Sequence, residues 1–134
     1  MTTDSSPKPS GKLILRVVPM PADVNRNGNI FGGWVMSQMD IAGGIIANQC
    51  ARSRVVTVSV QTINFIRPIN VGDLVGVYGE IVRVGRTSIT VYLEVYVSSV
   101  LPPPLDANES CLVASSAFTF VAIDDNGRPH PVDR

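Results

Sequence analysis

The pattern of hydrophobic and polar positions divides the chain into one strand, one long helix and a series of further strands. Residues 12–18 form a short apolar run that ends at prolines, which predicts a strand followed by a loop. Residues 22–29 are mostly turn formers. From Gly32 or Gly33 to about Arg52, apolar or small residues occur on nearly every side of a helix. We therefore predict one long helix that is buried almost all round.

After residue 54 the pattern becomes that of β-strands. Apolar and polar residues alternate from residue 56, and the phase changes near Gln61 and Thr62, which predicts a β-bulge there. Further strands are predicted over residues 74–84, 88–97 and 111–122, and Gly85 supplies the turn of a hairpin. An antiparallel sheet covers such a helix only by curling around it, so the predicted fold class is α+β.

Length and composition are those of one globular domain. The chain has 134 residues, enough for one core, and 45% of them are hydrophobic. We predict a flexible N-terminal tail over residues 1–11, a single domain over 12–123 and a polar C-terminal tail over 124–134. A five-strand layer cannot cover every side of the helix or both of its own edges, so we expect self-association.

Charge and cysteine usage exclude several classes of function. Lys plus Arg equals Asp plus Glu, 11 each, which argues against a nucleic-acid-binding or membrane-surface protein. Cys50 and Cys111 show neither metal-type spacing nor a disulfide framework, and the first residues contain no apolar signal core. We therefore expect a cytoplasmic protein. His, Cys and carboxylates do not cluster, so no metal site is predicted.

Asp40 is the first candidate for chemistry. It is the only charged residue between Arg26 and Arg52, inside the apolar helix. An unpartnered buried carboxylate costs several kcal/mol, so we expect Asp40 to be buried and to be used. Two structural interpretations stay open: Asp40 could accept backbone N–H groups in a closely packed helix, or it could cap a shorter helix that begins at Ile41.

The start of the helix offers hydrogen-bond donors. The first N–H groups, at Gly32 and Gly33, have no intrahelical partner and form a positive end that can polarise a carbonyl or hold an oxyanion. A tight turn is the alternative. Asn25, in the preceding loop, could orient a water or donate to a carbonyl oxygen, and it could equally be a turn residue.

Other mechanisms find less support in the residues. His130 is the only histidine and lies in the predicted C-terminal tail, where a solvated residue is expected, so a Ser-His-Asp or Cys-His site is disfavoured. A set of polar residues could bind phosphates through forked hydrogen bonds or could be ordinary surface residues: Arg67, Arg83, Arg86, Thr87 and Ser88.

Several short motifs follow one another in a fixed order along the chain. They are Asp23-x-Asn25-x-x-Gly28-x-x-x-Gly32-Gly33, Met39-Asp40, Phe65-x-Arg67-Pro68, Val71-Gly72-Asp73 and Gly85-Arg86-Thr87-Ser88. In this order and spacing they resemble the acyl-CoA thioesterases of the hotdog fold, and the YciA-type group in particular. The resemblance covers roughly residues 20–121. It implies a curved antiparallel sheet of five or six strands wrapped around one long central helix.

The resemblance also implies a function. The expected reaction is hydrolysis of acyl-CoA thioesters to a free acid and CoA, with CoA as part of the substrate and product and no separate cofactor. The family's helix acid falls on Asp40, and its loop asparagine falls on Asn25, which would face the acid of the neighbouring subunit. Whether Asp40 acts as general base or as nucleophile stays open. The family's CoA contacts fall near the predicted hairpin: Arg83, Gly85, Arg86, Thr87 and Ser88.

The resemblance further implies a homodimer at least, and commonly a hexamer built as a trimer of dimers. The partner expected is therefore acyl-CoA, without nucleic acid or membrane. The alternative function is a non-catalytic acyl-CoA binding module on the same fold, which would not need the acid on the helix. A hotdog dehydratase or hydratase would need a histidine paired with an acid, and the body of this chain has no histidine.

Overall fold

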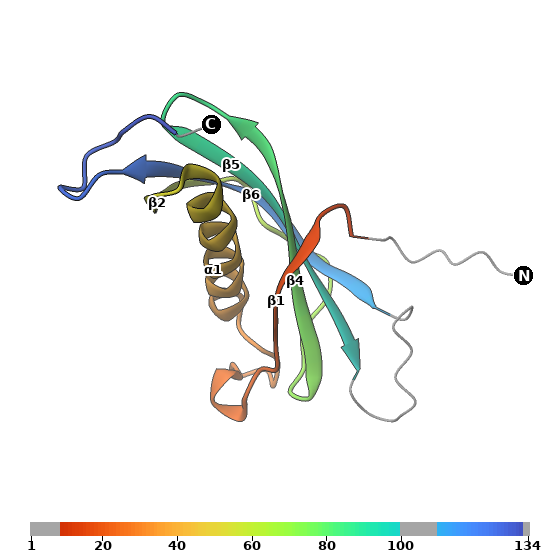
Figure 1. Cartoon of the computed structure of the whole chain (residues 1–134). Helices are drawn as coiled ribbons and strands as arrows, with labels where there is room; N and C mark the ends of the chain where they lie inside the picture. The colour runs from red at the N-terminus through yellow and green to blue at the C-terminus, as the bar shows by residue number, and fades with distance from the viewer. Residues whose placement is uncertain (1–8, 100–109, 133–134) are drawn as a thin grey trace, which may run out of the picture.

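The computed structural model describes residues 9–99 and 110–132, which form one long helix packed on a curved antiparallel sheet (Figure 1). In chain order the elements are β1 (Lys12–Val17), η1 (Pro21–Asp23), α1 (Gly32–Ala51), β2 (Arg54–Val60), β3 (Asn64–Phe65), β4 (Asp73–Val84), β5 (Ser88–Ser99) and β6 (Cys111–Ile123). The strands follow the order β1-β4-β5-β6-β2, and β3 also pairs with β6. This arrangement confirms the predicted fold class.

The long central strands provide most of the core. Along β5, the residues that face α1 are fully buried, and they alternate with half-buried or buried residues on the other face. The inward residues are Ile89, Val91, Leu93 and Val95. On the helix, Met39 and Gly43 are buried against the sheet, and a Cβ atom at Gly43 would lie 2.8 Å from the ring of Phe120. The helix therefore packs very closely at this point.

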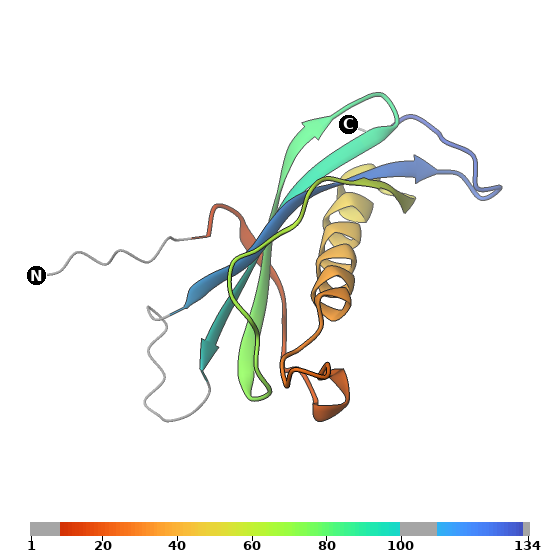
Figure 2. The ribbon, with the colours of Figure 1, turned by 180° about the vertical axis from the view of Figure 1, so that it is seen from behind.

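Only one side of α1 is buried, so the prediction of a helix covered almost all round is wrong for a single chain. Figures 1 and 2 show α1 on one side of the sheet only. Val35, Met39, Ala42 and Ala47 are buried, whereas Ile41 is 52% exposed. The reason is geometric, because one sheet layer can touch only the side of the helix that faces it.

The connection from β2 to β3 differs from the predicted bulge. The register against β6 shifts between Thr57 and Ser59, and the strand itself is interrupted over residues 61–63. The interruption stays attached to the sheet, because Gln61 N donates to Ala117 O at 3.0 Å and Ser116 Oγ donates to Gln61 O at 2.9 Å. The alternation of apolar and polar residues indicates that a bulge interrupts the strand. The position of the bulge depends on how β2 pairs with β6.

The face of the sheet away from α1 carries polar and aromatic side chains. Glu94, 8% exposed, accepts hydrogen bonds from Ser10 N at 2.9 Å and from Tyr92 Oη at 3.3 Å. Desolvation by burial raises the pKa of Tyr96 to about 12. Within residues 9–99 and 110–132 the Tyr96 hydroxyl has no hydrogen-bond partner.

The described part of the predicted C-terminal tail, residues 124–132, folds back on the sheet. Asp124 Oδ1 accepts hydrogen bonds from the backbone N–H groups of Arg128 and Asn126, which hold the pKa of this carboxyl below its usual value. His130 N donates to Ala122 O at 3.0 Å, and Val132 is buried. Residues 1–8 of the predicted N-terminal tail and the proline-rich segment after Val97, residues 100–109, lie outside the described residues. The division into tails and domain stays a prediction.

Candidate active site

The loop before α1 is held by the side chain of Asn25. Its Oδ1 accepts hydrogen bonds from Asn27 N at 2.8 Å and from Asn29 N at 3.2 Å, and Asn25 N donates to Asn29 O at 2.7 Å. This is the turn role that the sequence left open. Because the carbonyl oxygen is committed to the loop, the Nδ2 amide is the group of Asn25 that can donate to a ligand.

The start of α1 presents backbone donors. Within the described part of the chain no side chain caps this helix, and its first backbone bonds run from Trp34 N and Val35 N to Phe31 O, at 3.0 and 3.4 Å. The N–H groups of Gly32 and Gly33 precede these bonds and lie at the positive end of the helix. Nothing within 4 Å would meet a Cβ atom at Gly33, so this backbone is approachable.

Asn25 and Gly32 line one cavity of about 460 Å³. Its other walls are mainly apolar: Ile30, Val35, Phe65, Ile69 and Val113, with Arg67 at the same cavity. Phe65 stands directly over the helix start, because its Cζ lies 3.2 Å from the position of a Cβ atom on Gly32. The cavity thus has hydrogen-bond donors, at Asn25 and the start of α1, beside mainly apolar walls. Such an arrangement suits the binding of a small molecule.

Asp40 is exposed in the single chain, which corrects the expectation that it is buried. Its Oδ1 accepts a hydrogen bond from Thr57 Oγ1 of β2 at 2.5 Å. The interpretation of Asp40 as the cap of a shorter helix is wrong, since α1 runs without interruption from Gly32 to Ala51. Asp40 is exposed because β2 is an edge strand and, among residues 9–99 and 110–132, no helix or strand covers this side of α1.

Exposed hydrophobic residues nevertheless occur on the side of α1 that the sheet does not touch. We call this side the uncovered face; besides Asp40 it carries Met36, Ile41 and Ile45, each 40–52% exposed. Exposed hydrophobic residues gathered on one side of a helix are typical of an interaction site. Among the described strands β2 is an edge strand that pairs only with β6, so its outer side is open to a further strand.

The helix start and Asp40 lie well apart along α1 within one chain. Gly33 and Asp40 are separated by seven residues of α1, which is about 10 Å along the axis at ~1.5 Å per residue. Seven residues are also about two turns, so both groups lie on the same side of the helix. A general base needs to be within hydrogen-bond reach of the reacting group, or one water away.

The predicted CoA contacts lie on the β4–β5 hairpin, at the end of the sheet opposite to the start of α1 (Figure 1). Gly85 N donates to Ser88 O at 2.8 Å, and Thr87 O accepts from Ala122 N at 2.9 Å. Arg83 and Arg86 are exposed. The structure therefore does not bring this group together with Asn25 and Gly32 in one chain.

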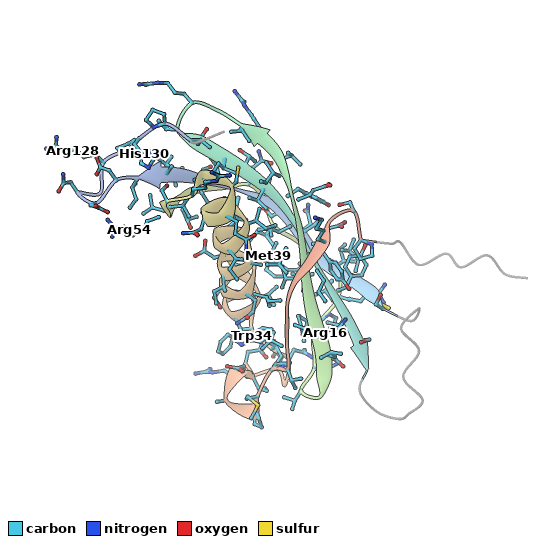
Figure 3. All side chains as sticks on the ribbon, in the orientation of Figure 1. Arg16, Trp34, Met39, Arg54, Arg128 and His130 are labelled. Atoms are coloured by element: carbon cyan, nitrogen blue, oxygen red, sulfur yellow. The ribbon has the colours of Figure 1, made fainter. Side chains whose placement is uncertain are left out.

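Two arginines near this end were not singled out by the sequence. Figure 3 shows Arg54, Arg128 and His130 at one end of the molecule and Trp34, in the first turn of α1, towards the other. Arg54 Nη2 donates to Asp124 O at 3.0 Å, which ties the start of β2 to the C-terminal turn. No spacing along the chain could have linked these residues, since they are 70 positions apart.

The described residues contain neither a membrane-spanning helix nor a cluster of metal-binding side chains. Within residues 9–99 and 110–132 no helix is long and apolar enough to cross a membrane. Over the same residues, no group of three or more His, Cys, Asp or Glu side chains is placed to hold a metal ion.

Comparison with known proteins identifies the family. Residues 27–101 match the Thioesterase superfamily. An uncharacterized acyl-CoA thioester hydrolase of Haemophilus influenzae is 50% identical over 98% of this chain and 85% of its own length. The acyl-CoA thioester hydrolase YciA of Salmonella typhimurium is 46% identical over 98% of this chain and 96% of its own.

Solved structures agree with the sequence comparison. The aspartate-to-alanine mutant of HI0827, a hexameric broad specificity acyl-coenzyme A thioesterase, superposes with a TM-score of 0.88 at 50% identity and covers 93% of this chain and 88% of that one. A hexameric hotdog fold thioesterase of Campylobacter jejuni gives a TM-score of 0.84 at 38% identity over 92% and 91%. The chain belongs to the thioesterase superfamily, within the YciA-type acyl-CoA thioester hydrolases of the hotdog fold.

Proposed function

We propose that this protein hydrolyses acyl-CoA thioesters to a free acid and CoA, at a site formed between two subunits. One observation carries the proposal: the backbone donors at the start of α1 and the carboxylate of Asp40 lie on one uncovered side of the helix, and Gly33 and Asp40 are about 10 Å apart along its axis. The names of the relatives, which are acyl-CoA thioester hydrolases, support the substrate class.

A second copy of the chain would bring Gly33 of one subunit close to Asp40 of the other. The midpoint between Gly33 and Asp40 falls between Met36 and Ser37, which are both exposed on the same side of α1. A two-fold axis at that point would run two α1 helices antiparallel and place Gly33 of one subunit opposite Asp40 of the partner subunit. The same contact would cover the uncovered face and desolvate both carboxylates.

Each residue then has a defined role. The thioester carbonyl accepts hydrogen bonds from the N–H groups of Gly32 and Gly33, which stabilise the oxyanion as it forms. The Asn25 amide donates to the carbonyl or positions the water. Asp40 of the partner subunit either takes a proton from water, which attacks the carbonyl carbon, or attacks that carbon itself. In the first route the carbon–sulfur bond breaks and the proton that Asp40 took from water passes to the sulfur, so CoA leaves as the thiol. In the second route the carbon–sulfur bond breaks to give a mixed anhydride with Asp40; water then hydrolyses the anhydride to the free acid and Asp40, and its proton neutralises the CoA thiolate.

Thr57 positions the acid. Its hydroxyl donates to Asp40 Oδ1 and fixes one carboxylate oxygen, which leaves the other oxygen to accept a proton or to attack. The apolar cavity beside Gly32 suits the acyl group. The hairpin residues Arg83, Gly85, Arg86, Thr87 and Ser88 are proposed to bind CoA phosphates from another subunit, because in their own chain they lie at the far end of the sheet.

The assembly and location follow from the same proposal. Two relatives of known structure are described as hexameric, and we propose a homodimer as the minimal active unit, assembled into a trimer of dimers. Acyl-CoA substrates favour the cytoplasm. We propose no cofactor, since CoA enters and leaves with the substrate.

The deciding experiment is a thiol-release assay over a panel of acyl-CoAs, with the wild-type protein and the Asp40→Asn variant measured in parallel. Removal of a general base lowers kcat by roughly 10²–10⁴-fold. Because Asn has nearly the size of Asp and its amide oxygen can still accept the hydrogen bond from Thr57, Asp40→Asn should keep the oligomer and its CoA affinity. Normal turnover by the variant would remove Asp40 from the mechanism, and wild-type protein that binds CoA without thiol release would favour the non-catalytic binding module.

A further inference from the structure

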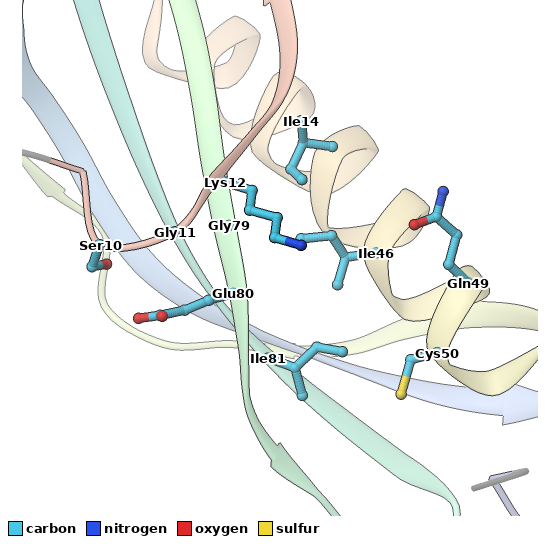
Figure 4. A pocket seen from close by; sticks show the side chains of 10 residues that line it. All are labelled: Ser10, Gly11, Lys12, Ile14, Ile46, Gln49, Cys50, Gly79, Glu80 and Ile81. Carbon is cyan, nitrogen blue, oxygen red and sulfur yellow. The ribbon is translucent and has the colours of Figure 1, made fainter.

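A second cleft lies on the side of α1 away from Asp40. It has a volume of about 680 Å³ and separates the C-terminal half of α1 from strands β1 and β4 (Figure 4). Ile14, Ile46 and Ile81 form apolar walls that come from three different elements. The cleft shares no residue with the cavity at Asn25 and Gly32 and none with the hairpin.

The strand register places one cation in this cleft. Lys12 of β1 pairs with Gly79 of β4. The Lys12 side chain therefore lies on the face of the sheet to which a Cβ atom on Gly79 would point. That face is turned to the helix, because a Cβ atom at Gly79 would lie 2.9 Å from Ile46 Cδ1. Figure 4 shows the Lys12 ammonium directed towards Ile46.

The acid beside the cleft lies on the other face. Glu80 follows Gly79 along β4, and successive residues of a strand point to opposite faces. Figure 4 shows the Glu80 carboxylate directed away from Ile46 and Ile81. Among the described residues that line the cleft, Lys12 and Glu80 are the only charged ones. The ammonium group of Lys12, an exposed residue, is therefore the one charge on the side of the cleft that carries the three isoleucines.

We infer that this cleft binds a monoanionic carboxylate with an apolar chain, such as a medium-chain fatty acid. The isoleucine walls offer burial to the chain, and the ammonium group offers a charge-assisted hydrogen bond to the carboxylate. CoA itself is a poor match, because its several phosphates call for several cations. The choice of ligand class rests on the proposed function, since hydrolysis of acyl-CoA releases acids of this kind.

The two cysteines provide a built-in reporter. Cys50 lines the cleft, whereas Cys111, which is also half-buried, lies on β6 outside it. The experiment measures the maleimide-labelling rate of each thiol by mass spectrometry, with decanoate, decanol or CoA as the probe. It is run on the wild-type oligomer and on Asp40→Asn, so that binding is measured independently of turnover. Decanoate should slow labelling of Cys50 about tenfold near saturation and leave Cys111 unchanged.

Two variants test the site itself. Lys12→Met should weaken the protection of Cys50 by decanoate about three- to tenfold. Decanoate and decanol should then protect Cys50 equally. Ile81→Trp should fill the cleft and abolish protection. Val82→Trp is the matched control, because Val82 is the next residue of β4, is 54% exposed and does not line the cleft, so its protection should equal that of the wild type.

Three outcomes would overturn the inference, and a fourth separates it from the proposed function. Cys50 that reacts equally with and without decanoate would show that no acid binds there, and equal protection by decanol and decanoate would refute the carboxylate class. Cys50 that resists maleimide without any probe would mean that another subunit fills the cleft. A failure of thiol release in the acyl-CoA assay, with protection intact, would contradict the proposed function and leave this site standing.

Discussion

Asp40 illustrates how the residues beside a position in the sequence can differ from those that cover it in the structure. The next residue, Ile41, is apolar but 52% exposed, and Asp40 is exposed with it. Asp40 contacts Thr57 of the edge strand β2 instead of a core. An exposed carboxylate keeps its hydration, so it costs little until a second surface covers it. The expected burial of Asp40 is therefore wrong for the single chain.

At the residue scale, two adjacent glycines of α1 allow a matched test of packing. Gly43→Ala puts a Cβ atom 2.8 Å from the ring of Phe120, which is 1% exposed and stacked on Phe118, whereas Gly44→Ala meets Phe120 at 3.9 Å, an ordinary contact. Both variants gain helix propensity, about 1 kcal/mol, but overpacking costs Gly43→Ala roughly 1–3 kcal/mol. Thermal or urea unfolding should show Gly43→Ala to be the less stable variant, and equal stabilities would contradict the close packing.

At the element scale, β3 is short but sets one wall of the candidate site. Asn64 and Phe65 pair with Ser115 and Ala114 of β6, and Ile66 N donates to Val113 O at 2.7 Å. These bonds hold Phe65, which is 50% exposed, over the start of α1. The interruption before β3 lets the chain leave the line of β2 and reach this position.

Phe65 should therefore limit the acyl groups that the cavity accepts. Phe65→Ala enlarges the cavity beside Gly32, so the ratio of kcat/KM for long over short acyl-CoAs should rise by about tenfold, the usual effect of a pocket change of one methylene or more. Val71→Ala is the control, because Val71 is similarly exposed at 46% and lies outside the cavity. An unchanged profile would mean that the acyl group binds elsewhere.

At the scale of the whole molecule, the proposed function requires two copies of the chain. Gly33 and Asp40 lie on the same side of α1, about 10 Å apart along its axis. Asn25 lies in the loop before the helix and lines the same cavity as Gly32. One chain therefore has all the proposed parts of a site, but its donors and its acid lie apart.

Mixed oligomers test this arrangement directly. Asn25→Ala and Asp40→Asn should each inactivate the pure oligomer. When the two variants are unfolded together and reassembled, each mixed dimer holds one site with both changes and one intact site, so about a quarter of wild-type activity should return on random mixing. A site built within one chain would show no recovery, because every site would keep a defect.

The amino-acid order determined the order and type of the main elements. The helix from residue 32, the hairpin at Gly85 and the strands around it follow from local periodicity and turn chemistry, which depend on near neighbours, and the motifs pointed to the family. The tertiary structure alone decided which side of α1 stays uncovered, where β2 shifts its register, and that Arg54 meets the C-terminal turn. Such features arise from contacts between segments that are distant in the sequence, and local sequence patterns do not specify which segments come into contact.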